Sequence, residues 1–260
     1  MLNIIKLEAR DLPDLWFQAV YNVLQHGREF KIDKGSYEGQ TRLEYDYFIG
    51  HVLFPGNKPL LPEIPPQYGI PNPVEEAYLY GGEGHSRSYL EYLMTPRKEP
   101  NESYTYGARL TKAPLVETYP TSLVVPHAID GTVAFFEGNG VYLNQIEWVI
   151  EMYKKHGHRN NQMVLQIASP TDLMLKDPPC LRSIDTRIQD NKLHFFVYFR
   201  SWDLWGGFPA NLAAIQHLKE YMADGIGVED GEMIVESKGL HLYDYAVPFA
   251  RMRCVCEERG

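Results

Sequence analysis

Three segments of the chain repeat apolar residues at the three- and four-residue spacing of an amphipathic helix. The first spans residues 12–27 and ends in a glycine, the usual residue just past a helix end. The second spans residues 142–157 and carries two lysines in its last turn, where positive charge interacts favourably with the helix dipole. The third runs from about residue 211 to Gly225. The pattern predicts three helices, with these residues inward: Trp16, Val20, Val23 and Leu24; Ile146, Val149, Ile150 and Tyr153; Leu212, Ile215, Leu218 and Met222.

Between the second and third segments the apolar period changes to two, which is typical of strands. The run "QMVLQIASP" alternates loosely, and "SIDTRI" and "LHFFVYF" flank Asp190-Asn191, a turn pair that indicates a β-hairpin. Two more strand-like runs, "EMIVES" and "GLHLYDYAV", follow the third helix. Strands and helices interleave, so the predicted fold class is α+β (mixed α/β) rather than a doubly wound parallel sheet. One face of the second hairpin strand carries Leu193, Phe195, Val197 and Phe199.

The composition is that of a globular protein with a sizeable core, since 44% of the 260 residues are hydrophobic. We expect a single domain over residues 1–260. Residues 55–73 hold seven of the eighteen prolines and are expected to form a long ordered loop. The net charge of −9 argues against nucleic acid or an anionic membrane as partner, while leaving room for a pocket that binds one phosphate.

The sequence gives no indication of secretion or of a membrane span. No stretch of about 18 apolar residues occurs, and the N-terminal segment carries acidic residues early. The three cysteines have no framework spacing, so we expect a reducing, cytoplasmic environment. Cys254 and Cys256 have no second ligand pair nearby, and we expect no metal site.

Cys180 follows two prolines, at the end of a loop and the start of a predicted strand. A lone cysteine is most often a small buried apolar residue. The alternative is a nucleophile, which needs a nearby cation to lower its pKa. Arg200 ends the hairpin that starts just after Cys180, so the two residues are expected to lie side by side.

Four segments in order resemble the motifs of the thymidylate synthases, and most of all the short archaeal members. The segments are "YGARL" (106–110), "DPPC" (177–180), "FRSWDLWGGFPAN" (199–211) and "HLY" (241–243). Arg200 follows Cys180 by twenty positions, Asn211 follows Arg200 by eleven, and His241 follows Asn211 by thirty, as in the family. The resemblance implies a three-layer fold whose large mixed sheet packs against its copy in a homodimer.

The resemblance also implies that the enzyme converts dUMP to dTMP. Cys180 would add to C6 of uracil, and C5 would then attack the methylene group of methylenetetrahydrofolate or a related reduced pterin. Arg200 would favour the thiolate and, with Ser201, would bind the nucleotide phosphate. Tyr106 would join the hydrogen bonds that move the C5 proton.

Further residues of the motifs would bind the substrate and the pterin. Asn211 would pair with O4 and N3 of uracil, His241 and Tyr243 would bind the sugar hydroxyl, and Asp203 would accept from the pterin N–H groups. Each has a simpler alternative. Arg200 could be a surface charge, Asn211 a helix N-cap, and the His241–Tyr243 pair half-buried strand residues.

The chain also departs from the family pattern near the base. Leu181 replaces the usual histidine after the nucleophile, and Asp185 replaces a glutamine. Asp185 could serve a cytosine base, whereas Asn211 favours uracil. The alternative function is therefore a 5-hydroxymethylase acting on dCMP, CMP or dUMP, in which water resolves the intermediate. A nucleotide-binding protein without chemistry is a third possibility, against which Cys180 and Arg200 argue.

Other family features have weak counterparts here. Family members use two adjacent arginines to bind the phosphate in the partner subunit, and only Arg159 is present here. Arg182 could also act across a dimer. The family also has an arginine in an N-terminal loop, for which Arg42 is the candidate. The usual C-terminal tail is replaced by "MRCVCEERG". The catalytic glutamate is assigned to Glu91, and the rival candidates are Glu75, Glu76 and Glu83.

Overall fold

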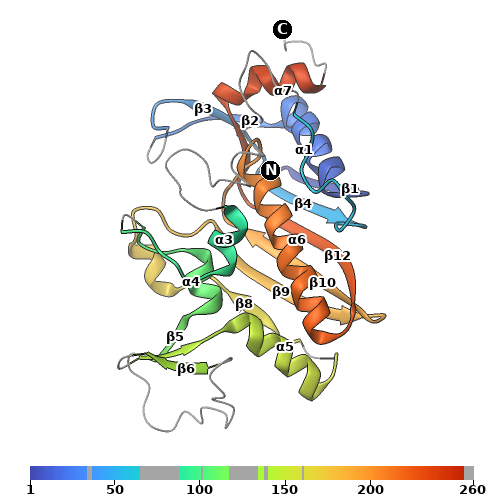
Figure 1. The fold of residues 1–260 in the computed structure, drawn as a ribbon. Helices are drawn as coiled ribbons and strands as arrows, with labels where there is room; N and C mark the ends of the chain where they lie inside the picture. The colour runs from blue at the N-terminus through green and yellow to red at the C-terminus, as the bar shows by residue number, and fades with distance from the viewer. Residues whose placement is uncertain are drawn as a thin grey trace.

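The computed structural model describes residues 1–33, 37–64, 88–100, 102–116, 134–137, 140–159 and 161–254. Its largest element is a six-stranded sheet in the order β1-β4-β12-β10-β9-β8 (Figure 1). The β1–β4 and β10–β12 pairs are parallel and the others antiparallel, so the α+β prediction is confirmed. The strands are β1 (Ile4–Ala9), β4 (Tyr47–Val52), β8 (Val164–Gln166), β9 (Leu181–Gln189), β10 (Lys192–Phe199) and β12 (Glu229–Ser237).

Three helices lie against one face of this sheet: α1 (Leu12–His26), α5 (Gln145–His156) and α6 (Gly207–Ile226) (Figure 1). They correspond to the three predicted helices, and every predicted inward residue is buried. Asp11 caps α1 by accepting from the Asp14 backbone N–H, and Asn144 caps α5 in the same way. Burying each large apolar side chain contributes about 1.5–3 kcal/mol before the entropy cost of ordering it.

The β9–β10 hairpin is confirmed, and Asp190 and Asn191 both have the positive φ of its two-residue turn (51° and 59°). Burial alternates along β10, with Leu193 and the other predicted inward residues covered by the helices of the same chain. The apolar face predicted from the sequence therefore needs no second subunit to cover it. The face of the sheet that is left for an interface between copies is the opposite one, where Phe196 and Tyr198 are half-buried.

Helix α6 begins four residues earlier than the sequence pattern predicts. Asp203 accepts from the backbone N–H groups of Gly206 and Gly207, so the loop before the helix supplies its N-terminal cap. Pro209 is tolerated because the first N–H groups of a helix have no partner within the helix. Asn211 is consequently an interior residue of α6, and its interpretation as an N-cap is wrong.

A smaller sheet lies beside the large one, in the order β11-β13-β3-β2. Near it, α7 (Val247–Cys254) packs on α1, and α3 (Tyr89–Met94) packs on α4 (Tyr106–Thr111) and α6. Short 3₁₀ turns cover Pro170–Met174 (η1) and Asp244–Ala246 (η2). The remaining strands are β2 (Arg28–Lys31), β3 (Thr41–Glu44), β5 (Ala113–Val116), β6 (Ala134–Glu137), β7 (Gly140–Leu143), β11 (Trp202–Asp203) and β13 (Leu240–Tyr243).

The prediction of a Pro-rich loop is only partly covered by the structure. Residues 55–64 are described and contain no regular helix or strand, whereas residues 65–73 lie outside the described residues. Most of the buried apolar side chains of the described residues form one core cluster. The single domain over residues 1–260 stays a prediction.

Candidate active site

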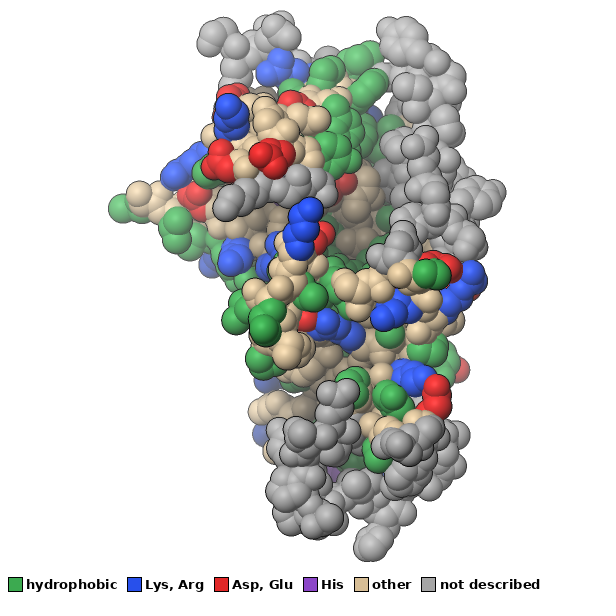
Figure 2. All heavy atoms as spheres, turned by 90° about the vertical axis from the view of Figure 1, so that its left-hand side faces the viewer, with side chains coloured by type: hydrophobic (Ala, Val, Ile, Leu, Met, Phe, Trp, Pro, Cys, Tyr) green, Lys and Arg blue, Asp and Glu red, His purple; other side chains and the backbone are tan. Residues whose placement is uncertain are grey.

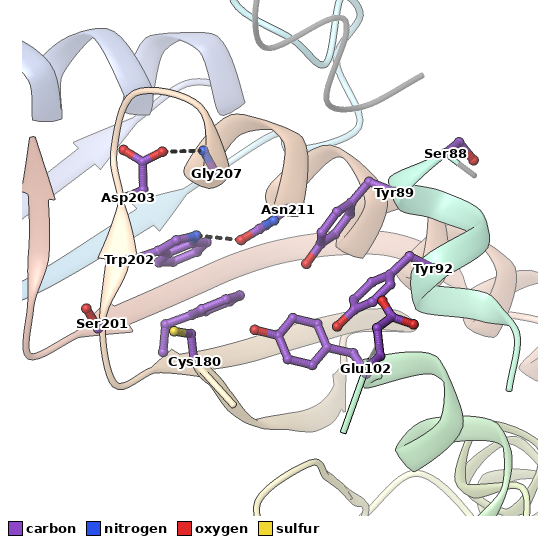
Figure 3. A pocket seen from close by; sticks show the side chains of 12 residues that line it. Ser88, Tyr89, Tyr92, Glu102, Cys180, Ser201, Trp202, Asp203, Gly207 and Asn211 are labelled. Atoms are coloured by element: carbon purple, nitrogen blue, oxygen red, sulfur yellow. Dashed lines mark hydrogen bonds between the residues drawn. The ribbon is translucent and has the colours of Figure 1, made fainter. Parts of the chain in front are cut away.

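A cavity of about 370 Å³ lies between the end of β10, the first turns of α6 and the α3–α4 segment (Figure 3). Its volume is within the range of small-molecule sites. Five residues that the motifs predict to be in the site line this cavity, together with Trp202. The motif residues are Tyr106, Cys180, Ser201, Asp203 and Asn211, of which Tyr106 comes from the α4 side.

Cys180 is held in place by the residue that the sequence placed beside it. The Arg200 backbone N–H donates to the Cys180 carbonyl at 2.8 Å. The Arg200 guanidinium donates from Nε to the carbonyls of Pro178 and Pro179 at 3.2 Å and forms an ion pair with Asp177 at 3.0 Å. Arg200 thus fixes the turn that presents the thiol, while its own side chain does not line the cavity wall.

Burial raises the pKa of the Cys180 thiol, and the nearby Asp177 raises it further. Arg200 and Arg182 act in the opposite direction, but they do not overcome the effect of burial. Arg200 therefore lowers the pKa of the thiol, as predicted. The net pKa shift is upward, however, whereas an activated thiolate would need a lowered pKa. The neutral thiol is favoured in this state of the protein.

Asn211 projects from the second turn of α6, and only 8% of it is exposed. The indole Nε1–H of Trp202 donates to its carboxamide oxygen Oδ1 at 2.8 Å (Figure 3). Trp202 stacks on Phe199, with ring centroids 3.8 Å apart and 9° between the planes. Trp202 is not predicted as a site residue from the sequence, because an aromatic residue at this position is typical of the core.

Asp203 lines the cavity beside Asn211 and makes three hydrogen bonds to the α6 loop. Its carboxylate accepts from the backbone N–H groups of Trp205, Gly206 and Gly207 at 3.1–3.2 Å. Burial raises the pKa of Asp203, and these three donors oppose that shift. Its firmest role is therefore to shape the loop, although a carboxylate can accept further hydrogen bonds from a ligand.

The opposite wall of the cavity is formed by the α3–α4 segment. Tyr106 OH accepts from the Leu181 backbone N–H at 3.2 Å, which ties α4 to the start of β9. Burial raises the pKa of Tyr106 well above its ordinary value, so the phenol stays protonated. The cavity residues on this side that the sequence analysis missed are Ser88, Tyr89, Tyr92 and Glu102 (Figure 3).

Glu102 is the glutamate among the described residues that lines this cavity, and its Oε2 accepts from the Glu99 backbone N–H at 2.8 Å. Glu91 lies on α3, where it forms an ion pair with Arg97 at 3.4 Å and does not line the cavity. The rival candidates Glu75, Glu76 and Glu83 lie outside the described residues. No spacing in the sequence distinguishes Glu102 from other acidic loop residues.

A buried carboxylate braces the two segments that meet at Cys180. Asp172, in η1, is 1% exposed and accepts a two-pronged hydrogen bond from Arg109 of α4. Arg182 of β9 lies 3.5 Å from the same carboxylate. Burial alone would raise the pKa of Asp172, but the bonds from Arg109 and Ser169 and the charge of Arg182 hold it below its ordinary value.

His241 and Tyr243 lie on β13, where His241 pairs with Asp203 of β11. Neither lines the cavity wall, although His241 is adjacent to it through this pairing. His241 Nδ1 is 2.8 Å from the Gly239 carbonyl, which can only accept, so Nδ1 carries the proton. Its Nε2 is a buried acceptor with no hydrogen-bond partner within the described chain. Arg42, the N-terminal candidate, is opposite Tyr243 on β3 and bonds to Glu44.

Burial lowers the pKa of His241 to about 4, the Gly239 bond opposes this, and Arg42 adds to it. The unfolded chain takes up this proton near pH 6.5, whereas the folded chain does so only near pH 4. Stability should therefore fall as the pH drops from 6.5 to 4, by about 3 kcal/mol from this residue. Urea unfolding of the wild type and of His241→Gln across this range measures the effect. The free energy of unfolding of the wild type should fall more steeply with decreasing pH than that of the variant. Equal pH dependence in the two proteins would contradict the lowered pKa of His241.

The structure does not bring Asp185 or Arg159 to the cavity. Asp185 is exposed on β9, on the face away from the helices, and its carboxylate accepts from the Thr186 backbone N–H. Because side chains alternate along a strand, its neighbours in sequence, Ile184 and Thr186, point to the core instead. Arg159 is exposed at the far end of the hairpin, in a polar hollow that it shares with Arg187. Asp185 therefore does not line the cavity within one chain, and its expected role near the base stays a prediction.

The surface on the left of Figure 1 is drawn face-on in Figure 2. It has a recess near the middle of the molecule, with charged side chains of both signs beside it.

Among the described residues, no group of three or more His, Cys, Asp or Glu side chains could hold a metal ion. No helix within the residues that the structure describes is long and apolar enough to cross a membrane.

A sequence model of the thymidylate synthase family matches residues 97–257, a range that includes most of the cavity residues. The chain belongs to the thymidylate synthase family. Similar proteins span nearly its whole length. A protein of Methanosarcina mazei is 26% identical over 239 residues, covering 92% of this chain and 89% of its own.

Two further relatives come from Methanothermobacter thermautotrophicus and Methanopyrus kandleri. They are 24% and 23% identical, and the matches cover 92% and 93% of this chain and 93% and 94% of their own lengths. All three relatives carry the name "Putative thymidylate synthase". The resemblance stated from the motifs is thus confirmed at the level of the family.

Proposed function

We propose that this thymidylate synthase family member methylates dUMP at C5 to give dTMP, with a methylene-bearing reduced folate or related pterin as cosubstrate. The observation that carries the proposal is the meeting of Cys180 and Asn211 in one cavity. A thiol supplies the nucleophile, and a carboxamide can donate to O4 and accept from N3–H of one uracil ring. The two residues come from different elements, the turn before β9 and the second turn of α6, so their convergence on one cavity favours a shared ligand.

The cavity chemistry fits both reactants. Its walls combine the aromatic rings of Tyr89, Tyr92 and Trp202 with the Asp203 carboxylate, which suits flat heteroaromatic rings bearing N–H groups. When bound, the reduced folate would supply the one-carbon unit and the hydride that completes the methyl group. The residues of the chain would bind and orient the rings, exclude water and move protons.

In the proposed reaction the Cys180 sulfur forms a bond to C6, and the electron pair of the C5–C6 double bond becomes available at C5. The thiol must lose its proton first, and Arg200 lowers the cost of that step although burial opposes it. After C5 has bonded to the one-carbon unit, its proton leaves through the Tyr106 region. The bond between the methylene carbon and the folate nitrogen would break as that proton leaves, which gives an exocyclic methylene group at C5. Addition of hydride from the reduced folate to this methylene, with departure of the sulfur from C6, then restores the C5–C6 double bond and returns Cys180 unchanged.

The sugar and phosphate would lie toward β13 and the Arg200 turn. The unpaired His241 Nε2 can accept from a sugar hydroxyl, and Tyr243 lies beside it with ring centroids 4.6 Å apart. Ser201 lines the cavity and can donate to a phosphate. Arg200 would have to exchange a carbonyl partner for the phosphate, or bind it with a remaining N–H group. Glu102 is the proposed carboxylate for proton transfer, in place of Glu91.

The product identifies the reaction directly. Incubation of the enzyme with methylenetetrahydrofolate and dUMP, dCMP, UMP or CMP in turn should give dTMP from dUMP, detected by mass spectrometry. A hydroxymethyl product, which contains one more oxygen than the methyl product, would replace this proposal with the hydroxymethylase alternative. Formation of neither product, with nucleotide binding retained, would favour a binding protein without chemistry. The Cys180→Ser variant is the negative control.

A further inference from the structure

Trp202 is fixed in position from three directions. Its ring stacks on Phe199 and contacts Phe208, whose ring centroid is 4.5 Å away, and 3% of the residue is exposed. Its backbone N–H donates to the Gly239 carbonyl at 3.0 Å, as part of the β11–β13 pairing. The direction of the indole N–H is therefore set by packing and by the strand, before any ligand binds.

An indole N–H can donate a hydrogen bond but cannot accept one. The Asn211 atom 2.8 Å from Trp202 Nε1 must accordingly be the carboxamide oxygen, and the assignment of oxygen and nitrogen follows from chemistry alone. Figure 3 shows the nitrogen of Asn211 on the side away from Trp202. The amide thus has one orientation, with its NH₂ group and the second lone pair of Oδ1 available to a ligand.

This orientation matches only one kind of pyrimidine edge. A 4-oxo pyrimidine offers an acceptor at O4 for the NH₂ group and an N3–H donor for the free lone pair of Oδ1. A 4-amino pyrimidine offers the reverse, a donor at position 4 and an acceptor at N3. To pair with it the amide would have to flip, which would turn its NH₂ group toward the indole N–H of Trp202. Two buried donors would then face each other without an acceptor.

We infer that Trp202 is a specificity-determining residue that locks Asn211 in the orientation selecting 4-oxo over 4-amino pyrimidine nucleotides. Its influence on the base passes through Asn211, so Trp202 acts as a positioning residue. The inference rests on the proposed function insofar as it takes the ligand to be a pyrimidine nucleotide. It adds that the choice between uracil and cytosine depends on the pair Trp202–Asn211 and not on Asn211 alone.

The test compares the dissociation constants of dUMP and dCMP, measured by calorimetry in the wild type and in Trp202→Phe. Phenylalanine keeps an aromatic ring for Phe199 but has no N–H, so the amide becomes free to flip. The wild type should prefer dUMP, and the preference should fall on the order of tenfold in the variant, the worth of about one hydrogen bond. Trp205→Phe is the matched control, since Trp205 is also buried in this loop and packs on Trp16. It should leave the ratio unchanged.

A second substitution separates the N–H from the packing. Replacement of Trp202 by 3-benzothienylalanine keeps the shape of the indole and exchanges only its N–H for sulfur, so folding is preserved if Trp202→Phe is unstable. The dUMP preference should fall here too. An unchanged ratio of the dUMP and dCMP dissociation constants in this variant would contradict the inference that Trp202 fixes the orientation of Asn211. So would an equally large loss of dUMP preference in Trp205→Phe.

The outcomes distinguish the inference from the proposed function. A wild type that binds dUMP preferentially, with a ratio insensitive to the Trp202 substitutions, contradicts the inference and leaves the methylation proposal standing. A wild type that prefers dCMP contradicts the orientation of Asn211 itself. A wild type that binds neither nucleotide contradicts the proposed function, and the inference with it.

Discussion

Cys180→Ser should reduce turnover of dUMP by at least about a thousandfold while leaving nucleotide binding within about tenfold of the wild type. A serine hydroxyl is far less acidic than a thiol and a much poorer nucleophile toward C6. The pocket would change little, because Cys180 is only half-buried and its position depends on the backbone contact with Arg200. Steady-state turnover and equilibrium binding of dUMP measure the two quantities separately.

The matched control is Cys254→Ser, which alters a buried cysteine of α7 outside the cavity. Its turnover should stay near the wild-type value after correction for stability. The wild type and this control should also form a covalent adduct with 5-fluoro-dUMP and methylenetetrahydrofolate, visible as a mass increase on the protein. Near-normal turnover in Cys180→Ser would remove the assignment of the nucleophile.

The side-by-side placement of Cys180 and Arg200 was predictable from the hairpin, but its detail was not. A regular hairpin closed by Asp190-Asn191 would place Arg200 opposite Leu181. An irregularity between Tyr198 and Phe199 shifts the pairing by one residue, so Arg200 donates to the Cys180 carbonyl instead. The composition of a strand does not specify where it bulges, because a bulge depends on packing with neighbouring strands.

The long elements were predictable because each carries its own periodic pattern, as in α1, α5 and the β9–β10 hairpin. The short strands β2 and β3 and the six-residue helices α3 and α4 have too few residues to show a period. The motif residues Cys180, Ser201 and Asn211 were likewise predictable, because they lie at the ends of one hairpin and in the helix that follows it, so their spacing in the sequence fixes their separation in space. The opposite wall was missed because its residues reach the cavity only through tertiary packing.

Trp202 and Glu102 illustrate the same limit. The sequence pattern indicates that Trp202 is a core residue, and the structure buries it. Its indole N–H, however, also bonds to Asn211 and so sets the orientation of that side chain. Glu102 lies in a polar loop where an acidic residue carries no signal. Asp185 illustrates a related limit, because a motif position does not specify which face of the strand a side chain occupies, and this side chain lies on the face away from the helices.

That other face of the large sheet is the reason to expect a homodimer. Aromatic and aliphatic side chains, including Phe196, Tyr198 and Ile234, lie half-buried on it among charged residues, with no helix of the described chain packed over them. Such a face on a six-stranded sheet is suited to pairing with its own copy around a twofold axis. We propose that the dimer forms there and that Arg159 reaches the phosphate site of the partner subunit.

Mixing Cys180→Ser with Arg159→Ala should then give more activity than either protein has alone. In a heterodimer, one site combines Cys180 of the Arg159→Ala subunit with Arg159 of the other, so it carries neither lesion. Random exchange makes about half of the dimers mixed, each with one intact site of two, so up to about a quarter of wild-type activity should return. Arg159→Ala alone should be weakened because Ser201 and Arg200 supply few contacts for a phosphate of charge near −2.

The matched control is Lys154→Ala, which removes an exposed cation from the last turn of α5. This variant should keep its own activity, and mixing it with Cys180→Ser should give only the activity contributed by its own sites. Subunit exchange must be followed independently, by native mass spectrometry of the mixed species. If mixed dimers form and the Cys180→Ser and Arg159→Ala mixture stays inactive, Arg159 does not act across the interface. A monomer by light scattering would remove the shared site altogether, because no partner subunit would then be present to donate the arginine.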